Sequence, residues 1–300
     1  MREPRNPSPD VTPGDANVLP DNAGPTQCED GDWHCVQHLI TILPMSRHLA
    51  LLALVLLPFG CGGSPDPTTA PEPLRIAAAS DLQTVMPKLI ARFQELHRIE
   101  LSATYGASGQ FAQQIKQGAP YDLFLSANRK FVADLANAKI IVPETVRDYA
   151  KGSLALVIRD EVPDTVKSLA DLMDPSIKKI AVANPETAPY GAAAKQALQT
   201  VKLWDVLEPK RVQAETVRQA LQFVQTGNAE AGLVGKAIAN VPGVRVIPID
   251  EALHEPLWQA VGVVADSKMF DHANAFITFI REGEGKTILR DAGFTVDFER

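Results

Sequence analysis

From residue 74 onward the chain repeats one order: a short apolar run, a turn rich in serine or glycine, and a longer segment with apolar residues at helical spacing. In the first unit the apolar run is 74–79, the turn begins at Ser80, and apolar residues recur every three or four positions from 82 to 93. We expect Ser80 to cap this helix and Pro87 to be tolerated because it lies early in it. Repeated strand–turn–helix units are typical of an α/β fold with mainly parallel sheets.

The later units divide this body into two lobes. Further strands are expected at 99–105, 122–125, 153–158, 180–183, 232–234, 244–249 and 258–265. Further helices are expected to begin near Phe111, Asn128, Pro189, Glu215 and Ala273. We assign 74–153 and 242–298 to lobe 1 and 154–241 to lobe 2. Because the chain then crosses between the lobes twice, near 153 and 241, the sequence predicts a hinge and a cleft.

The pattern is absent before residue 74. Residues 1–44 are polar and predict a disordered extension. Residues 45–61 contain a short basic start, the apolar run 49–57 and a small-residue end, which is typical of a secretory signal. That run is too short to span a bilayer core of roughly 30 Å. Because signals normally begin a chain, we hypothesise that Met45 is the true start and that 1–44 is a mis-assigned extension.

The end of the signal predicts a lipid anchor. Gly60 and Cys61 resemble the end of a bacterial lipoprotein cleavage box, although the two preceding residues, Pro58 and Phe59, are unusual for one. Ordinary cleavage nearby is the alternative. Residues 62–73 are rich in proline and threonine and predict a tether. The exported body is therefore expected in the periplasm, either free or as a membrane-anchored lipoprotein facing the periplasm.

Charge and cysteine content exclude several classes of protein. The chain has a formal net charge of −7 and a sequence pI of about 5.4, which argues against a nucleic-acid binder with a broad basic face. Residues 1–60 hold three of the 29 basic and seven of the 36 acidic residues, so the exported body has a net charge of −3. Cys28 and Cys35 also fall in the removed part, so this body has no disulfide.

Candidate chemistry lies where predicted strands end and helices begin. These junctions carry Ser80, Ser108, Ser126, Tyr190 and Val217. Helix starts present free backbone N–H groups and a partial positive charge, and serine hydroxyls add further donors. Several such starts in one cleft would bind a small anion without lysine or arginine. For Ser126 we favour simple helix capping.

Enzyme motifs are absent. The chain has no Gly-x-Ser-x-Gly elbow, no phosphate loop ending in Gly-Lys-Ser/Thr and no His-Glu-x-x-His. Asp81 and Asp122 could pair as acid and base, but capping of helix ends is the better explanation. We therefore expect a protein that is not an enzyme. A secreted hydrolase that uses Ser80 or Ser108 is the alternative from another class.

Five motifs follow one another along residues 74–298, with Phe294 near the end: 77–80, 105–109, 118–127, 183–191 and 214–221. Together they resemble the periplasmic molybdate-binding proteins of ABC uptake systems. The resemblance implies a type II periplasmic-binding-protein fold, with two α/β lobes that close on molybdate or tungstate in the cleft between them. It also implies a monomer without a cofactor, which delivers the anion to the membrane subunits of an ABC permease and binds no nucleic acid.

The resemblance assigns the anion-binding residues. Ser80 and Ser108 would donate hydroxyl and backbone N–H groups, and Tyr190 and Val217 would donate backbone N–H groups, all to oxygens of the anion rather than to its metal. Gly235 departs from the pattern, because many members have a tyrosine there whose hydroxyl reaches the anion. Water, another residue or Lys236 could replace this donor. Gly235 also motivates the alternative of a same-fold receptor for sulfate, phosphate or an organic carboxylate.

Overall fold

The computed structural model describes residues 72–297, which form two five-stranded sheets, one in each lobe. The predicted extension 1–44, the signal 45–61 and nearly all of the tether 62–73 lie outside the described residues. No helix among the described residues is both long enough and apolar enough to cross a membrane.

The sheet of lobe 1 has the strand order β2-β1-β3-β10-β4. These strands are β1 (Leu74–Ala79), β2 (Leu101–Gly106), β3 (Leu123–Ser126), β4 (Arg147–Gly152) and β10 (Leu257–Val263). Strand β1 pairs parallel with β2 and β3, whereas β10 pairs antiparallel with β3 and β4. Only β10 therefore runs against the other strands of this sheet.

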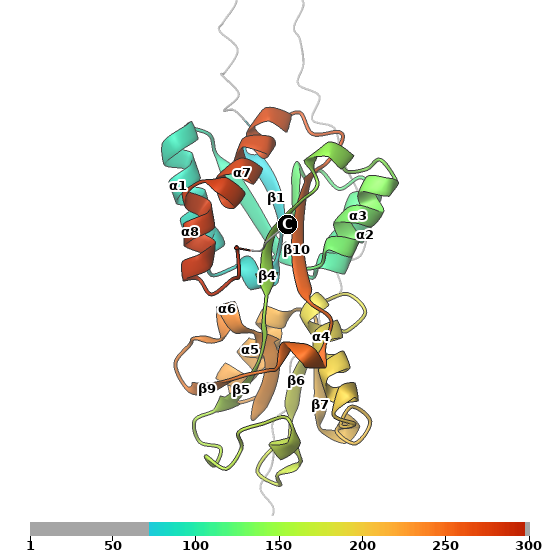
Figure 1. Ribbon diagram of the computed structural model, residues 1–300, viewed down its shortest axis with the longest axis vertical. Coiled ribbons are helices and arrows are strands. Elements are labelled where there is room, and N and C mark those ends of the chain that lie inside the picture. Colours follow the sequence, from blue (N-terminus) through green and yellow to red (C-terminus); the bar gives the residue numbers. More distant parts are fainter. Residues whose placement is uncertain (1–71, 298–300) are drawn as a thin grey trace, which may run out of the picture. The chain divides into compact units, whose positions relative to one another are not determined.

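Helices cover both faces of this sheet. Figure 1 shows α1 (Met86–His97), α7 (Phe270–Glu282) and α8 (Glu284–Asp291) on one side and α2 (Ser108–Lys116) and α3 (Arg129–Asn137) on the other. Side chains alternate along β3, so Leu123 and Leu125 join the core under α1 and α7, while Phe124 joins the core under α2 and α3. A sheet buried on both faces needs such continuous apolar runs, which is why the sequence predicts β3 well.

The sheet of lobe 2 repeats this plan with the order β7-β6-β8-β5-β9. Its strands are β5 (Leu154–Arg159), β6 (Ile180–Ala183), β7 (Arg211–Ala214), β8 (Ala231–Gly235) and β9 (Val244–Pro248), and its helices are α4 (Pro189–Thr200), α5 (Val217–Gln225) and α6 (Lys236–Ala239). Strand β6 pairs parallel with β7 and β8, and β5 pairs antiparallel with β8 and β9. The α/β prediction with mainly parallel sheets is confirmed, with one reversed strand in each sheet.

Short 3-10 helices complete the described chain. They are η1 (Ser80–Leu82), η2 (Pro143–Thr145), η3 (Ala170–Met173), η4 (Glu208–Lys210) and η5 (Glu251–Leu253).

The second lobe boundary, expected near 241, is wrong. Strand β9 pairs along its whole length with β5, so it belongs to the sheet of lobe 2. The chain returns to lobe 1 only after η5, with β10. An apolar run predicts a strand but not the sheet it joins, because sheet membership depends on distant pairing. The first crossing, between β4 and β5, lies at Ser153 as expected.

Two strands were not predicted. Strands β4 and β7 both lie at an edge of their sheet. An edge strand has one unpaired side and often carries charged residues, so its apolar signal is weak. Arg147, Asp148 and Lys151 interrupt the apolar pattern of β4 in this way.

The first helix begins later than predicted, so Ser80 does not cap it. Ser80 opens the 3-10 helix η1, and α1 begins at Met86 with Val85 as its N-cap. Pro87 explains the delay. Within the first turn its missing N–H costs nothing, whereas a longer helix would place its ring against a preceding carbonyl.

Candidate functional site

The four residues singled out for anion binding line one small cavity between the lobes. Ser80 and Ser108 come from lobe 1, and Tyr190 and Val217 come from lobe 2. The rest of the lining is given by Ala79, Asp81, Gly106, Ala107, Ala127, Ala188 and Pro189. The cavity volume is about 10 Å³, far below the roughly 300–1,000 Å³ of pockets for drug-sized ligands. The cavity therefore has no room for a ligand of that size.

The cavity forms where helices α2, α4 and α5 begin. Ser108 is the first residue of α2, Tyr190 the second of α4 and Val217 the first of α5. The N–H groups at these positions have no acceptor within their own helix. The N-cap of α4 is Ala188, which has no side-chain acceptor, and the N-cap Thr216 of α5 accepts from Gln219 instead. The N–H groups of Tyr190 and Val217 are thus free for a ligand.

The two cavity serines also have hydroxyl groups to donate. Ser108 is 1% exposed, and its Oγ accepts a hydrogen bond from the Ala127 N–H at 3.0 Å. Because that bond uses a lone pair, the hydroxyl hydrogen of Ser108 remains available. Ser80 is 6% exposed, and within residues 72–297 its Oγ has no hydrogen-bond partner. Both hydroxyls can therefore donate to an anion.

Ser126 is not the helix cap that the sequence predicts. Its Oγ donates to the carbonyl of Asn128 and accepts from the Asn128 N–H. The N-cap of α3 is Asn128 itself, whose side chain accepts from the Lys130 N–H. Ser126 therefore shapes the turn before α3, and it is not among the residues that line the cavity.

Among the residues that the structure describes, no cationic side chain lines the cavity. Its lining contains no lysine, arginine or histidine, and Arg218, one residue after Val217, is not part of it. Most of the other lining residues are alanine or glycine, which allow the backbone to approach a ligand closely. The wall offers hydrogen-bond donors without a full positive charge. Within the described residues, no three His, Cys, Asp or Glu side chains gather as a metal site would require.

The two lobes touch each other beside the cavity. The Gly109 N–H donates to the carbonyl of Thr187 across the lobes at 2.8 Å. Gln110 Nε2 donates to Glu215 Oε2 at 2.9 Å. A Cβ atom on Gly109 would lie 2.9 Å from the Thr187 carbonyl oxygen, so only glycine permits this approach. The structure thus describes the lobes in a closed arrangement.

Tyr190 explains why position 235 has no side chain. A Cβ atom on Gly235 would lie 3.0 Å from Cε1 and Cζ of the Tyr190 ring. A Cβ atom on Gly152 would clash with the hydroxyl oxygen of Tyr190. The buried ring of Tyr190 therefore fills the space beside Gly235, and a phenol hydroxyl is present there although residue 235 does not supply it.

A buried polar network beside the cavity was missed at the sequence level. Tyr149 Oη donates to Gln259 Oε1 at 2.8 Å. Gln259 Nε2 in turn donates to Asp81 Oδ2 at 2.5 Å and to Tyr190 Oη at 3.2 Å. Burial raises the pKa of Asp81 to about 6 and raises the pKa values of Tyr149 and Tyr190 well above their ordinary range. Gln259 lies within an apolar strand, so no local motif could reveal it.

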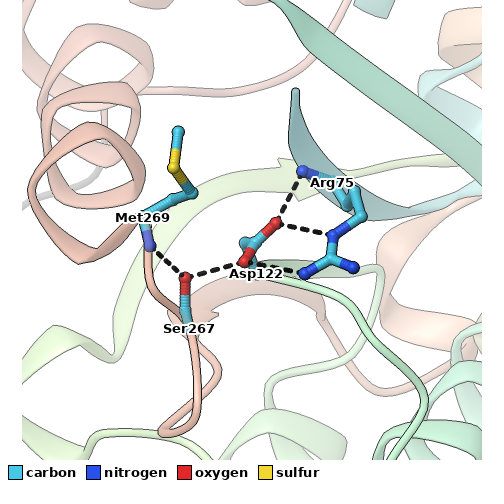
Figure 2. A network of polar contacts seen from close by, with 4 residues as sticks. All are labelled: Arg75, Asp122, Ser267 and Met269. Atoms are coloured by element: carbon cyan, nitrogen blue, oxygen red, sulfur yellow. Dashed lines mark hydrogen bonds and ion pairs between the residues drawn. The ribbon is translucent and has the colours of Figure 1, made fainter. Parts of the chain in front are cut away.

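Asp81 and Asp122 do not form an acid–base pair. Asp81 follows the end of β1, whereas Asp122 lies beside the start of β1, about 20 Å away along the strand. Figure 2 shows Asp122 held by Arg75 and Ser267. Its Oδ2 accepts from the Arg75 backbone N–H at 2.8 Å and from Arg75 Nε at 3.1 Å, and its Oδ1 accepts from Ser267 Oγ at 2.9 Å. The expected capping of helix ends is wrong for both residues, because neither Asp81 nor Asp122 is the N-cap of an α-helix.

Comparisons with known proteins identify the family of the chain. The family model described as bacterial extracellular solute-binding protein matches residues 74–295. YvgL of Bacillus subtilis (strain 168), provisionally named an ABC transporter substrate-binding lipoprotein, is 31% identical over 258 residues, which cover 84% of this chain and 98% of YvgL. The molybdate-binding protein ModA of Rhodobacter capsulatus is 30% identical over 232 residues, covering 77% of this chain and 91% of ModA.

A solved structure is similar as well. The periplasmic molybdate-binding protein of Azotobacter vinelandii has a TM-score of 0.69 and 27% sequence identity, with 75% of this chain and 100% of that chain covered.

Proposed function

The chain belongs to the family of bacterial extracellular solute-binding proteins, and from that premise we propose that it carries molybdate or tungstate for an ABC importer. The anion would enter the cavity between the lobes and be delivered to the membrane permease. Among the similar proteins, ModA of Rhodobacter capsulatus is a molybdate-binding protein, which supports this choice of cargo.

The observation that carries the proposal is a small cavity between the lobes to which four residues bring uncharged hydrogen-bond donors. Ser80, Ser108, Tyr190 and Val217 bring hydroxyl and N–H groups to one space that holds no cationic side chain. A dianion that has lost its water needs many short hydrogen bonds to offset the cost of desolvation. Donors in fixed positions also select the anion by size, because a smaller oxyanion would leave some of these hydrogen bonds too long. Molybdate and tungstate are larger than sulfate and phosphate.

Tyr190 supports the same assignment despite Gly235. Its ring fills the space beside Gly235, and its hydroxyl lies in the network next to the cavity. The loss of a tyrosine at 235 therefore need not remove a phenol donor from this region.

The absence of an arginine from the cavity speaks against an organic carboxylate, since carboxylates are usually held by a bidentate arginine. Arg218 was the one cation near the predicted motifs, and it does not line the cavity. Sulfate and phosphate remain the competing cargoes of the same site.

Export completes the proposal. We infer that residues 45–61 direct the chain out of the cytoplasm and that Cys61 carries the lipid anchor, so the binding lobes face the periplasm on the tether 62–73. The lipoprotein designation of YvgL supports this inference. Mass spectrometry of the mature N-terminus tests it, because acylation at Cys61 gives a defined mass increase and an unmodified N-terminus contradicts it.

Calorimetric titration with molybdate, tungstate, sulfate and phosphate tests the cargo. We expect micromolar or tighter binding of the first two and none of the others at the same concentrations. Ser80→Ala and Ser108→Ala should each weaken molybdate binding more than roughly tenfold, because each removes a hydrogen bond to a charged group, worth about 1.5–3 kcal/mol.

The matched control is Ser126→Ala. Ser126 is a buried serine whose hydroxyl bonds only to Asn128 outside the cavity lining, so its removal should leave molybdate affinity unchanged. Binding of sulfate or phosphate alone would transfer the cargo to that anion. If Ser80→Ala and Ser108→Ala bind like the control, the assigned site is wrong.

A further inference from the structure

Within residues 72–297, Asp81 is the one residue with a carboxyl side chain that lines the anion cavity. It is 0% exposed. Its Oδ2 accepts from Gln259 Nε2 at 2.5 Å, whereas its Oδ1 has no hydrogen-bond partner within residues 72–297. A buried carboxyl oxygen without a partner is costly and is therefore a candidate for contact with a ligand.

Asp81 also links the lobes. It belongs to lobe 1, Tyr190 belongs to lobe 2, and the Gln259 amide group donates to both of them. Tyr149 holds the other end of that amide group. The carboxyl group is therefore fixed in place when the lobes are closed, and it cannot turn away from the cavity without breaking this network.

No cation neutralises Asp81. Helices α5 and α6 and strand β2 pack against η1. The hydrogen-bond network connects the Asp81 side chain to Gln259 on β10 and, through Gln259, to Tyr190 on α4 and Tyr149 on β4. The titratable and charged residues on the nearby parts of these elements are Arg218 on α5, Lys236 on α6, Tyr105 on β2, Tyr190 on α4 and Tyr149, Asp148 and Lys151 on β4. None of these lysines or arginines forms an ion pair or hydrogen bond with Asp81.

An ionised Asp81 would repel the proposed cargo. Two like charges a few ångströms apart in a buried site interact strongly, because little water screens them. A neutral carboxyl group has the opposite effect, since it gains an O–H donor that an oxyanion can accept. Burial already raises the pKa of Asp81 to about 6 in the protein without an anion, and an adjacent dianion would raise it further. The phenols of Tyr149 and Tyr190 stay neutral, because burial raises their pKa values.

We propose that Asp81 binds the oxyanion as a neutral carboxylic acid, with Oδ1 donating its hydrogen to an oxygen of the anion. This inference rests on the proposed function and adds a specificity-determining residue to that site. Each anion then binds together with one proton, which Asp81 takes from the solvent; no bond of the anion is made or broken. Such a wall of donors favours a fully ionised oxyanion over one that carries its own proton, which would need an acceptor.

Proton uptake can be counted directly on the wild-type protein. Molybdate is titrated in buffers of different ionisation enthalpy, and the dependence of the heat on the buffer gives the protons taken up per anion. We expect about one proton per anion near pH 7.5 and fewer near pH 5.5, since Asp81 is then already protonated. Molybdate binding without proton uptake near pH 7.5 overturns the inference and leaves the proposed function intact.

Asp81→Asn supplies the matched test of the residue, because asparagine is a neutral group of the same shape that keeps an N–H donor. Wild-type affinity for molybdate should fall roughly tenfold between about pH 6.5 and 7.5, whereas that of D81N should change less than about twofold. Any proton taken up by the anion itself appears equally in both proteins. Asp122→Asn, far from the cavity, should keep the wild-type pH dependence. Equal pH dependence in D81N and the wild type overturns the inference.

The two proposals fail in different ways. If neither molybdate nor tungstate binds, the proposed cargo is wrong, and the proton count is repeated with sulfate, which has the same charge. A ligand-free experiment remains in every case: the unfolding temperature of the wild type should fall relative to that of D81N as the pH rises from about 4 to about 6. Parallel pH curves for the two proteins would show that Asp81 is not protonated in this range and would overturn the inference.

Discussion

The two ends of the lobe 1 sheet each bury one aspartate, but the partners of the two carboxyl groups differ. Asp122, at the start of β1 and β3, is 1% exposed and is held by the Arg75 guanidinium, the Arg75 backbone N–H and Ser267 (Figure 2). Asp81, at the other end of β1, is 0% exposed and has an amide and a phenol beside it but no cation. The same residue type is an ion-pair partner at one end and a carboxyl group with a raised pKa at the other.

The different surroundings of the two aspartates indicate different roles, a structural one for Asp122 and a proposed binding role for Asp81. At the Asp122 end a full positive charge meets the carboxylate, and the interaction raises the pKa of Arg75. At the Asp81 end the described lining residues include no cation, and Ser80, Ser108, Tyr190 and Val217 offer uncharged N–H and O–H groups beside the carboxyl group. A cation in the cavity would hold an anion more strongly but would also pair with Asp81. A site that must release its cargo gains from neutral donors, because lobe opening can then break the contacts one by one.

The largest effect that we expect is a change in the free energy of unfolding with pH, caused by Asp81. The pKa of Asp81 is about 6 in the folded protein and 3.8 by reference, a difference that corresponds to about 3 kcal/mol. Below about pH 4 the carboxyl group is neutral in both states and costs nothing extra. As the pH rises from about 4 to about 6, the unfolded state ionises before the folded state, so the free energy of unfolding falls, and above about pH 6 it levels off. D81N has no such loss.

Urea unfolding of ligand-free wild type and D81N between about pH 4 and 7 measures this effect. We expect D81N to become more stable than the wild type by up to about 3 kcal/mol at the upper end. A constant difference across that range would contradict the neutral state of Asp81.

The second effect concerns Asp122. Asp122→Asn should lower the free energy of unfolding by about 2 kcal/mol at neutral pH, because it weakens hydrogen bonds between charged groups. The ion-pair part of this effect is small, since the Arg75 side chain is 41% exposed and solvent screens it. Molybdate affinity should stay within about twofold, because Asp122 lies at the end of the sheet away from the cavity. A large loss of affinity without a loss of stability would show that the two ends are coupled.

The sequence could predict features that depend on neighbouring residues, but not those that depend on contacts between residues far apart in the chain. Local patterns predict most of the apolar strands and the turns at Ser80, Ser108, Tyr190 and Val217, and the structure brings these four residues to one cavity. The division into lobes was predicted less well, because it depends on distant pairing, which places β9 in lobe 2. Whether they bind molybdate stays a proposal. The edge strands β4 and β7 were missed because their partly solvent-exposed positions carry polar and charged residues, which interrupt the apolar pattern.

The polar network was beyond sequence reasoning for a different reason. Gln259 reaches Asp81 across 178 positions and Tyr149 across 110. Nothing near Asp81 in the sequence distinguishes it from Asp122, because the partners that separate them come from distant strands. The neighbour of Gly235 was not visible in the sequence for the same reason, since the ring that fills the space beside it belongs to Tyr190.

The smallest expected effect compares two glycines at the two ends of α2. Gly109 lies at the cavity end, where a Cβ atom would approach the backbone of Thr187 in the other lobe to 2.9 Å. Gly118 follows α2 at the Asp122 end, where a Cβ atom would meet nothing within 4 Å but the φ angle is +86°. Gly109→Ala should therefore oppose lobe closure and weaken molybdate binding roughly tenfold, about 1.4 kcal/mol, with little effect on the unfolding of either lobe.

Gly118→Ala is its matched control, because the same added methyl group meets strain instead of a neighbour. It should lower the free energy of unfolding by about 1 kcal/mol and leave affinity unchanged. Calorimetry with molybdate and urea unfolding of both variants separate the two outcomes. If Gly109→Ala bound molybdate as tightly as Gly118→Ala, the contact between Gly109 and Thr187 would not belong to the anion-bound state, and closure of the lobes would have to involve another surface.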